Sequence, residues 1–301
     1  QGNVRAQTLT SGPAGGFAVP FELDPTLILT SDGVTNPIRQ ISRVERITGR
    51  KWQGITSAGV TASYTATEGD EAPDASMTLA QPEVETVEAS AFAEYSITLD
   101  LAWGALQSQL ARAFQDAKDT LEARKFVAGT GSGEPSGVSS TLAPSSNVFV
   151  GGAFGVEDVF NLKSHGSNHL PPRFQGGAAF LGNGAVYDDI RMLSVGTVGQ
   201  GAVWSDSLQD GTPPRLLGKP AYEESEMDSD TTGSGENILV YGNFQYYLIV
   251  DRIGLTIEVV QHTFGGGGRP KTRRGALAYW MNNALILTSN AFRQLRTGTG
   301  S

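Results

Sequence analysis

The sequence predicts an α+β fold, in which helices and strands occupy separate stretches of the chain. One long amphipathic helix is expected over residues 100–128, and much of the remaining regular structure is expected to be strand. Helices and strands do not alternate regularly, so a doubly wound parallel sheet is not expected. The 38 glycines among 301 residues indicate many turns and long loops between these elements.

The expected helix over residues 100–128 has one apolar stripe. Its apolar residues recur mostly every three or four positions, as on one side of a 3.6-residue helix: Trp103, Leu106, Leu110, Ala113, Ala117, Leu121 and Ala128. Asp100 is expected to be the N-cap, because its carboxylate can accept the first free amides. Gly129, Gly131 and Gly133 are expected to end the helix, since glycine enters left-handed conformations freely. The helix would be roughly 40 Å long.

The stretch before residue 37 is expected to be an extended arm. It contains several prolines and glycines, with isolated apolar residues at Phe17, Val19, Phe21 and Leu23. Such a stretch cannot form a core of its own. The spaced apolar residues favour an arm that docks on a neighbouring chain over a loose terminus.

A long hairpin is expected between residues 53 and 100. Residues 53–66 and 77–100 have strand character, and the polar segment 68–74 between them is typical of a turn. Ala91, Ala93, Tyr95, Ile97 and Leu99 alternate with polar or exposed positions, as in a half-buried strand. A two-stranded hairpin is marginally stable alone, so this one is expected to lean on a partner chain.

The second half of the chain is expected to mix short helices with strands. Helices are expected over residues 157–163 and 185–193, and an acidic loop over 223–236. Strands are expected over the apolar runs at residues 178–181, 216–220, 238–241, 255–260, 276–287 and 291–295, and a short helix or bend is expected over residues 245–250.

Composition excludes several classes of protein. The formal charge is −9, from 22 basic and 31 acidic residues, which argues against wrapping of nucleic acid by a basic surface. The absence of cysteine excludes disulfides, thiolate metal sites and cysteine catalysis. No apolar run of about 18 residues predicts a membrane span, and none near Gln1 predicts a signal peptide.

No catalytic or cofactor motif is recognised. The run Gly129-Thr-Gly-Ser-Gly133 lacks the lysine of a phosphate-binding loop and follows a helix instead of a strand. The acidic loop near Asp228 has Leu239 where a calcium-binding loop needs its final glutamate. The aspartates at 188 and 189 are consecutive on a helix, so they point in different directions. No metal or cofactor is expected, and the chain is not expected to be an enzyme.

Two clusters of opposite charge are the candidate functional residues. The acidic cluster at the hairpin tip contains Glu68, Asp70, Glu71 and Asp74. The basic cluster follows a run of four glycines and contains Arg269, Lys271, Arg273 and Arg274. They are either two solvated surfaces, as charge runs usually are, or a contact in which the tip of one chain docks beside the basic cluster of its neighbour.

In this order, these features resemble the major capsid proteins of tailed phages with the Hong Kong 97 fold. The resemblance rests on the arm before Pro20, the hairpin, the long helix and the run that ends it, Gly129-Thr-Gly-Ser-Gly-Glu-Pro-Ser-Gly137. It continues through Ala178-Ala-Phe-Leu-Gly-Asn183, Leu217-Gly-Lys-Pro220, Tyr241-Gly-Asn-Phe-Gln-Tyr-Tyr247 and Ala291-Phe292. The glycine-rich run after the long helix is the most specific of these motifs, and together they cover nearly the whole chain.

The resemblance implies four parts. They are an N-arm (1–36), an extended hairpin loop (47–90), a peripheral domain with the long spine helix (37–46, 91–150 and 251–290) and an axial domain (151–250 and 291–301). It also implies hexamers and pentamers that close an icosahedral head around double-stranded DNA, without sequence-specific binding and without a membrane. Assembly would take place in the cytoplasm of a host bacterium.

The resemblance further implies partners other than the chain itself. They are a portal protein, a scaffolding segment or protein, a maturation protease and in some cases a cement or decoration protein. A chain that starts at Gln1, directly at the arm, fits removal of a scaffolding segment. Some family members cross-link through a lysine near the hairpin tip, but no lysine lies between Lys51 and Lys118 here, so that cross-link is not expected.

Two alternatives stay open at this point. An encapsulin, the shell protein of a bacterial nanocompartment, has the same fold, although the long proline- and glycine-rich arm favours the phage protein. A soluble enzyme or binding domain that uses the loop at Gly129 is the second alternative. The missing lysine and the missing nucleophile motifs argue against it.

Overall fold

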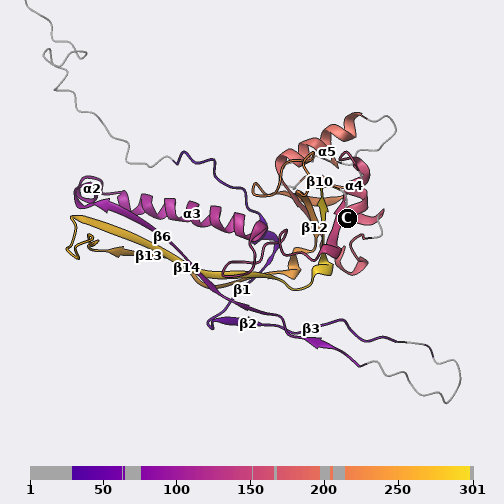
Figure 1. Ribbon diagram of the computed structural model, residues 1–301, viewed down its shortest axis with the longest axis horizontal. Coiled ribbons are helices and arrows are strands. Elements are labelled where there is room, and N and C mark those ends of the chain that lie inside the picture. Colours follow the sequence, from indigo (N-terminus) through magenta and orange to yellow (C-terminus); the bar gives the residue numbers. More distant parts are fainter. Residues whose placement is uncertain are drawn as a thin grey trace, which may run out of the picture.

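The computed structural model describes residues 29–62, 64, 76–150, 152–165, 168–196, 204–205 and 214–298. Two sheets lie one after the other along the long axis of the molecule (Figure 1). A long helix covers one face of the first sheet, and a narrow hairpin projects away from it. The mixed helix and strand content confirms the predicted α+β class.

The first sheet has four strands in the order β1-β13-β14-β6. They are β1 (Arg43–Arg46), β13 (Tyr247–Val260), β14 (Arg273–Ile286) and β6 (Val87–Ser96). β1 is parallel to β13, and the other neighbours are antiparallel. The strand predicted at 255–260 is part of the longer β13, which also includes most of the segment 245–250 that was predicted as a short helix or bend. Irregularities in the pairing of β13 with β14 lie between Asp251 and Thr256.

Helix α3 (Leu106–Ala128) packs on this sheet through a cluster of buried side chains. Leu106 and Phe114 of the helix contact the sheet residues Tyr95, Ala276 and Ala278 there. Small alanines in β14 let the helix approach the sheet closely. The predicted long helix is therefore present, and it ends at Ala128 as expected.

The predicted start of that helix was wrong. A separate short helix, α2 (Ile97–Ala102), follows β6, and the Ser96 hydroxyl caps it by accepting the amide of Leu99 at 3.1 Å. Asp100 lies inside α2 and pairs with Arg274, so it is not the N-cap of α3. Trp103 and Gly104 leave helical geometry between the two helices, which also places Ile97 and Leu99 in α2 and not in a strand.

The predicted apolar stripe was only partly right. Ala117, Leu121 and Ala128 are exposed, while Leu106 is buried as expected. The buried or nearly buried residues of α3 instead recur at every fourth position and form a seam along the helix. The last residues of this seam are Lys118, Glu122 and Phe126. Charged residues on this seam were assigned to the surface, and this shifted the predicted stripe around the helix.

The hairpin is confirmed at its base by two short antiparallel ladders. β2 (Lys51–Gln53) pairs with β5 (Glu83–Glu85), and β3 (Thr56–Ser57) pairs with β4 (Leu79–Ala80). The predicted continuous strands are therefore several short ones. Residue 63 and residues 65–75, including the predicted tip, lie outside the described residues.

The second sheet has seven strands in the order β7-β15-β12-β8-β11-β10-β9. Their bounds are β7 (Asn147–Phe149), β15 (Phe292–Arg296), β12 (Asn237–Gly242), β8 (Ala179–Gly182), β11 (Lys219–Glu223), β10 (Arg215–Leu216) and β9 (Trp204–Ser205). The strands predicted near 178, 238 and 291 are thus confirmed, whereas a turn at Leu217 and Gly218 divides the strand predicted at 216–220 between β10 and β11.

Two helices and several short turns complete this part. The helices are α4 (Val156–Phe160), continued by a π-helical turn (Asn161–His165), and α5 (Gly184–Gly196). Both match predicted helices. They pack on the sheet through a fully buried core that includes Val159, Leu162, Phe180, Ile190, Leu216 and Tyr241.

A second buried cluster joins the two sheets. The cluster contains Ile38 of the short helix α1 (Ile38–Ile41), Phe126 of α3, Val240 of β12 and Ile249 of β13. Short 3₁₀ turns surround these elements, at Pro144–Ser146, Pro172–Phe174, Phe244–Tyr246 and Ser289–Ala291. Side chains from four elements therefore hold the two parts of the molecule together.

Candidate functional site

The predicted basic cluster lies at one end of the first sheet, which we call the sheet tip and define as residues 92–101 and 257–275. Lys271 and Arg273 flank Glu94 at 3.8 Å and 3.2 Å. The Thr263 hydroxyl also donates to Glu94, at 2.6 Å. This hydrogen bond, followed by those to the two cations, holds the pKa of Glu94 below its ordinary value.

Arg274 has a different role from the other basic residues of the cluster. It pairs with Asp100, whose side chain is only 12% exposed, and so ties α2 to β14. Arg269 is exposed, and no ion pair to it occurs within the described residues. The four predicted basic residues are therefore together in space, but three of them already have partners in their own chain.

Exposed apolar side chains surround this cluster. Phe92 and Phe264 are 56% and 66% exposed, and Leu101 of α2 is 80% exposed. Phe92 lies against Gly275, where any side chain would collide with its ring. Exposed aromatic residues beside arginines are typical of surfaces that bind another protein.

The predicted acidic cluster, Glu68, Asp70, Glu71 and Asp74, lies outside the described residues. Docking of this cluster beside the basic one therefore stays a prediction. The described part of the hairpin does expose apolar side chains, including Ile55, Tyr64 and Leu79. A thin hairpin with exposed apolar residues gains stability where a partner covers it.

A buried ion network that was not predicted lies in the middle of the molecule. Arg39 of α1 donates to Glu122 of α3 at 2.5 Å and to Asp251 of β13 at 2.8 Å. Lys118 and Asn282 also donate to Glu122, both at 2.7 Å. Burial opposes the charge on Arg39, but the two carboxylates outweigh it and raise the pKa of Arg39 above its ordinary value.

Side chains of the glycine-rich loop 129–137 occupy the space that the loop encloses. Glu134 accepts the amide of Thr130 at 2.8 Å and pairs with Lys125 at 2.5 Å. The position that a phosphate would need is thus held by a carboxylate of the same chain, and this argues against nucleotide binding. The loop instead contacts the first sheet, because the amide of Ser136 donates to the carbonyl of Ala284 at 3.1 Å.

Gly129 ends the helix for a reason other than the predicted one. Its φ is −68°, outside the left-handed region, whereas Gly131 and Gly133 do have positive φ values. A Cβ at Gly129 would lie 2.1 Å from the carbonyl oxygen of Pro135. Close packing of the loop against the helix end therefore requires this glycine.

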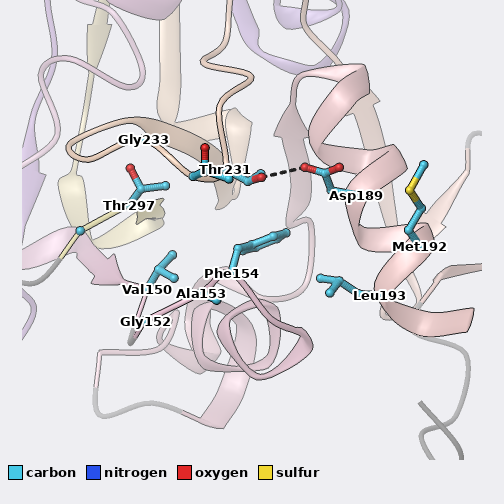
Figure 2. A pocket seen from close by; sticks show the side chains of 12 residues that line it. Val150, Gly152, Ala153, Phe154, Asp189, Met192, Leu193, Thr231, Gly233 and Thr297 are labelled. Atoms are coloured by element: carbon cyan, nitrogen blue, oxygen red, sulfur yellow. Dashed lines mark hydrogen bonds between the residues drawn. The ribbon is translucent and has the colours of Figure 1, made fainter. Parts of the chain in front are cut away.

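A pocket of about 710 Å³ lies at the edge of the second sheet (Figure 2). Val150, Phe154 and Leu193 give it apolar walls, and Asp189 accepts the Thr231 hydroxyl at 2.8 Å on its polar side. Asp188 points elsewhere and pairs with Arg191 at 2.5 Å, as expected for consecutive helical residues. The residues that line the pocket include no cysteine, serine or histidine that could serve as nucleophile or base.

Neither a metal centre nor a membrane span emerges from the described ranges. No group of three or more histidine, cysteine, aspartate or glutamate side chains there could hold a metal ion. None of the helices in those ranges is both long and apolar enough to cross a membrane.

Comparison with protein families identifies the chain. The model of the phage capsid family matches residues 15–273, which is most of the sequence. The chain belongs to the phage capsid family. No curated protein sequence matches it.

Solved capsid structures share the fold of this capsid protein over nearly its full length. The capsid of an empty gene transfer agent (GTA) particle has a TM-score of 0.77 at 20% identity, covering 97% of this chain and 99% of that chain. The capsid of a native GTA particle gives 0.77 at 19% identity, with the same coverage. Mycobacterium phage Ogopogo gives 0.63 at 12% identity, covering 94% of this chain and 98% of that chain.

Membership of this family confirms the capsid resemblance and the structural class. The capsid protein is a shell component that associates with further copies of itself, and such proteins are structural. The buried network at Glu122 was missed because its members are far apart in sequence. A signal was present, since Lys118 and Glu122 are four residues apart on the apolar side of a helix.

Proposed function

We propose that this chain is the major capsid protein of a tailed bacteriophage, whose hexamers and pentamers close an icosahedral head around double-stranded DNA. The observation that carries the proposal is the extent of the fold similarity, which covers 97% of this chain and 99% of a capsid chain. A match of this extent includes the hairpin, the long helix and both sheets. The exposed apolar residues of the hairpin and of the sheet tip are surfaces that such assembly would cover.

The four predicted parts fit this proposal, with residues 1–36 as N-arm and 47–90 as hairpin loop. The first sheet with α3 corresponds to the peripheral domain, and the second sheet corresponds to the axial domain. Strand pairing supports two adjusted boundaries: β7 pairs with β15 in the second sheet, and the start of β13 pairs with β1 in the first. We therefore place the boundaries before Asn147 and before Tyr247.

A GTA particle is the second candidate. The two GTA capsids have TM-scores of 0.77, against 0.63 for the Ogopogo capsid. Sequencing the DNA from purified particles separates the two: a single phage genome supports the phage head, and fragments spread over a host genome support the GTA. Both candidates use the same subunit contacts.

Assembly as proposed includes partners that the chain meets in a host bacterial cytoplasm. They are a portal protein, a scaffolding segment or protein, a maturation protease and, in some shells, a cement or decoration protein. Copurification of these proteins with particles from infected cells tests each partner separately.

We also propose that the acidic hairpin residues Glu68, Asp70, Glu71 and Asp74 dock beside the basic cluster of a neighbouring subunit. Arg269 is the best placed to take part, because Lys271 and Arg273 pair with Glu94 and Arg274 pairs with Asp100. Opposite charges at such a contact would determine the relative orientation of the two subunits more than their affinity.

Charge reversal tests this contact. Arg269→Glu is expected to lower the yield of closed shells at least several-fold while leaving the melting temperature of the subunit unchanged. Arg215→Glu, an equal charge change on β10, is the matched control and is expected to assemble normally. Combining Arg269→Glu with Glu71→Arg should restore shells; normal assembly of Arg269→Glu alone would reject the contact.

Electron microscopy of the purified full-length chain tests the proposed function itself. Closed uniform shells with DNA support the viral head, and small shells filled with other proteins support an encapsulin. A chain that forms no shells under any assembly condition, but binds a small molecule at defined stoichiometry, would support a soluble binding protein or enzyme.

A further inference from the structure

One loop of the second sheet's body holds three other parts of the chain together. This loop, residues 224–227, follows β11, and its last residue, Met227, is buried in the cluster that joins the two sheets. The Asn183 side chain, between β8 and α5, donates to the carbonyls of Ser225 and Met227 at 3.2 Å and 3.1 Å. The loop is therefore firmly anchored on the second sheet.

The same loop contacts the base of the N-terminal arm and the end of α3. The amide of Thr35 donates to the Ser225 hydroxyl at 3.1 Å, and the amide of Ser225 donates to the Thr35 carbonyl at 3.3 Å. Arg124 of α3 lies 3.5 Å from the Glu226 carboxylate. Opening this loop would free the arm base and weaken the hold on the helix.

Glu224 is the unusual residue of this loop. It is fully buried (0% exposed), and its Oε2 atom has no hydrogen-bond partner among the described residues. Its Oε1 atom accepts only one long bond, from the amide of Glu226 at 3.4 Å. A buried carboxylate without a cation is costly, so the neutral acid is the form that fits this site.

The charged groups around Glu224 do not supply the missing cation. Glu226 is the neighbouring charge on the same loop, and Arg124 of α3 pairs with Glu226. The arm contributes the uncharged Thr35 and the β8–α5 turn contributes the uncharged Asn183. Burial, and secondarily the charge of Glu226, raises the pKa of Glu224 to about 8.

We propose that residues 224–227 form a proton-linked latch, which closes on the arm base and on α3 as Glu224 takes up a proton. In the open loop Glu224 is solvated and ionises as an ordinary glutamate. Closing at neutral pH thus takes up about one proton per subunit, and the latch is tighter in mild acid than at pH 8. This property belongs to the single subunit and does not depend on shell assembly.

Hydrogen exchange of the full-length subunit between pH 5.5 and 8.5 tests the latch. The amides of Thr35 and Ser225, corrected for the intrinsic effect of pH, should lose protection at least tenfold between pH 6 and pH 8 and then level off. The amide of Val240 in β12 serves as the internal reference and should not follow this curve. In Glu224→Gln, which keeps the shape without the charge, protection at Thr35 and Ser225 should be independent of pH.

Glu226→Gln is the matched control. It removes the neighbouring carboxylate and the contact with Arg124, but it leaves Glu224 in place, so the pH dependence should persist. Equal pH dependence in wild type and Glu224→Gln would overturn the proposal. If Glu224→Gln does not fold, hydrogen exchange of the wild type alone still tests the latch. Protection at Thr35 and Ser225 that is independent of pH would overturn the proposal as well.

Discussion

Glu122 and Glu224 are both buried glutamates, yet their surroundings differ sharply. Glu122 is 3% exposed and accepts hydrogen bonds from Arg39, Lys118 and Asn282. Glu224 is 0% exposed and has one long bond to a backbone amide. Partners, more than depth, decide whether the charge of a buried carboxylate is compensated in the folded chain.

The difference follows from where each residue lies. Glu122 sits on α3 at the point where α1, β13 and β14 converge, so that cations and amides from separate elements reach it. Glu224 sits in a loop where Arg124 of α3 pairs with Glu226. The first region is expected to be rigid and the second to be adjustable, and four measurements can test this contrast.

The largest effect is expected from Arg39→Ala. This change leaves Glu122 and Asp251 without their shared cation, and removing one partner of a buried pair typically costs about 3–5 kcal/mol. Urea unfolding of the subunit measures the loss. Arg43→Ala removes a cation from an exposed pair with Glu45 and should cost less than about 1 kcal/mol.

A loss below about 1 kcal/mol in Arg39→Ala would show that the network does not fix this region. A second change separates the loss of the attraction to Arg39 from the cost of leaving the Glu122 carboxylate buried without that cation. Adding Glu122→Gln to Arg39→Ala should recover part of the stability, because the uncompensated carboxylate is then gone.

The next effect is the pH dependence that Glu224 gives to global stability. Its pKa is about 8 in the folded chain and near the ordinary 4.5 when unfolded, so the native state binds more protons between these values. The free energy of unfolding should therefore fall as pH rises from about 4.5 to about 8, by at most about 1.4 kcal/mol per pH unit. This contribution levels off about one pH unit above the folded pKa, once Glu224 is ionised in both states.

Glu224→Gln should flatten that slope. The variant is expected to be more stable than the wild type at pH 8, by about 3–4 kcal/mol, and about equal to it near pH 5. Denaturant titrations at pH 5.5, 6.5, 7.5 and 8.5 measure the difference. A wild type whose stability rises over this range, with a parallel curve for the variant, would contradict the assignment.

A smaller effect is expected from Lys118→Met. Methionine retains the apolar stem that packs in the seam but removes one donor of Glu122, which Arg39 and Asn282 still satisfy. The expected loss is about 1–2 kcal/mol, typical of one hydrogen bond to a charged group. A loss larger than that of Arg39→Ala would mean that Lys118, and not Arg39, is the main partner of Glu122.

Sequence patterns identified much of this fold because most of its elements obey simple periodicities. The alternation of Ala91, Ala93 and Tyr95 predicted β6, and the apolar runs predicted β8, β12, β14 and β15. The glycine-rich loop correctly marked the end of α3. These features depend on neighbours in the sequence, which local patterns report well.

The remaining errors arose where distant residues determine the structure. Lys118 and Glu122 lie on the buried seam of α3 only because Arg39, 83 residues away from Glu122, completes their pairing. Glu224 was assigned to a solvated acidic loop, since its burial comes from packing against distant parts of the chain. The hypothesis for the basic cluster likewise missed Glu94 and Asp100 as partners within the chain.

The smallest effect is expected at the sheet tip, where the ion pair between Glu94 and Arg273 lies at the surface. Arg273→Ala should change the free energy of unfolding by less than about 1 kcal/mol, because Glu94 and Arg273 are exposed to solvent. Thr263 is a stronger influence than either cation on the pKa of Glu94. NMR titration of the Glu94 side chain should therefore show a larger rise in its pKa for Thr263→Val than for Arg273→Ala. The reverse order would mean that charge, and not the hydrogen bond from Thr263, governs the pKa of this exposed carboxylate.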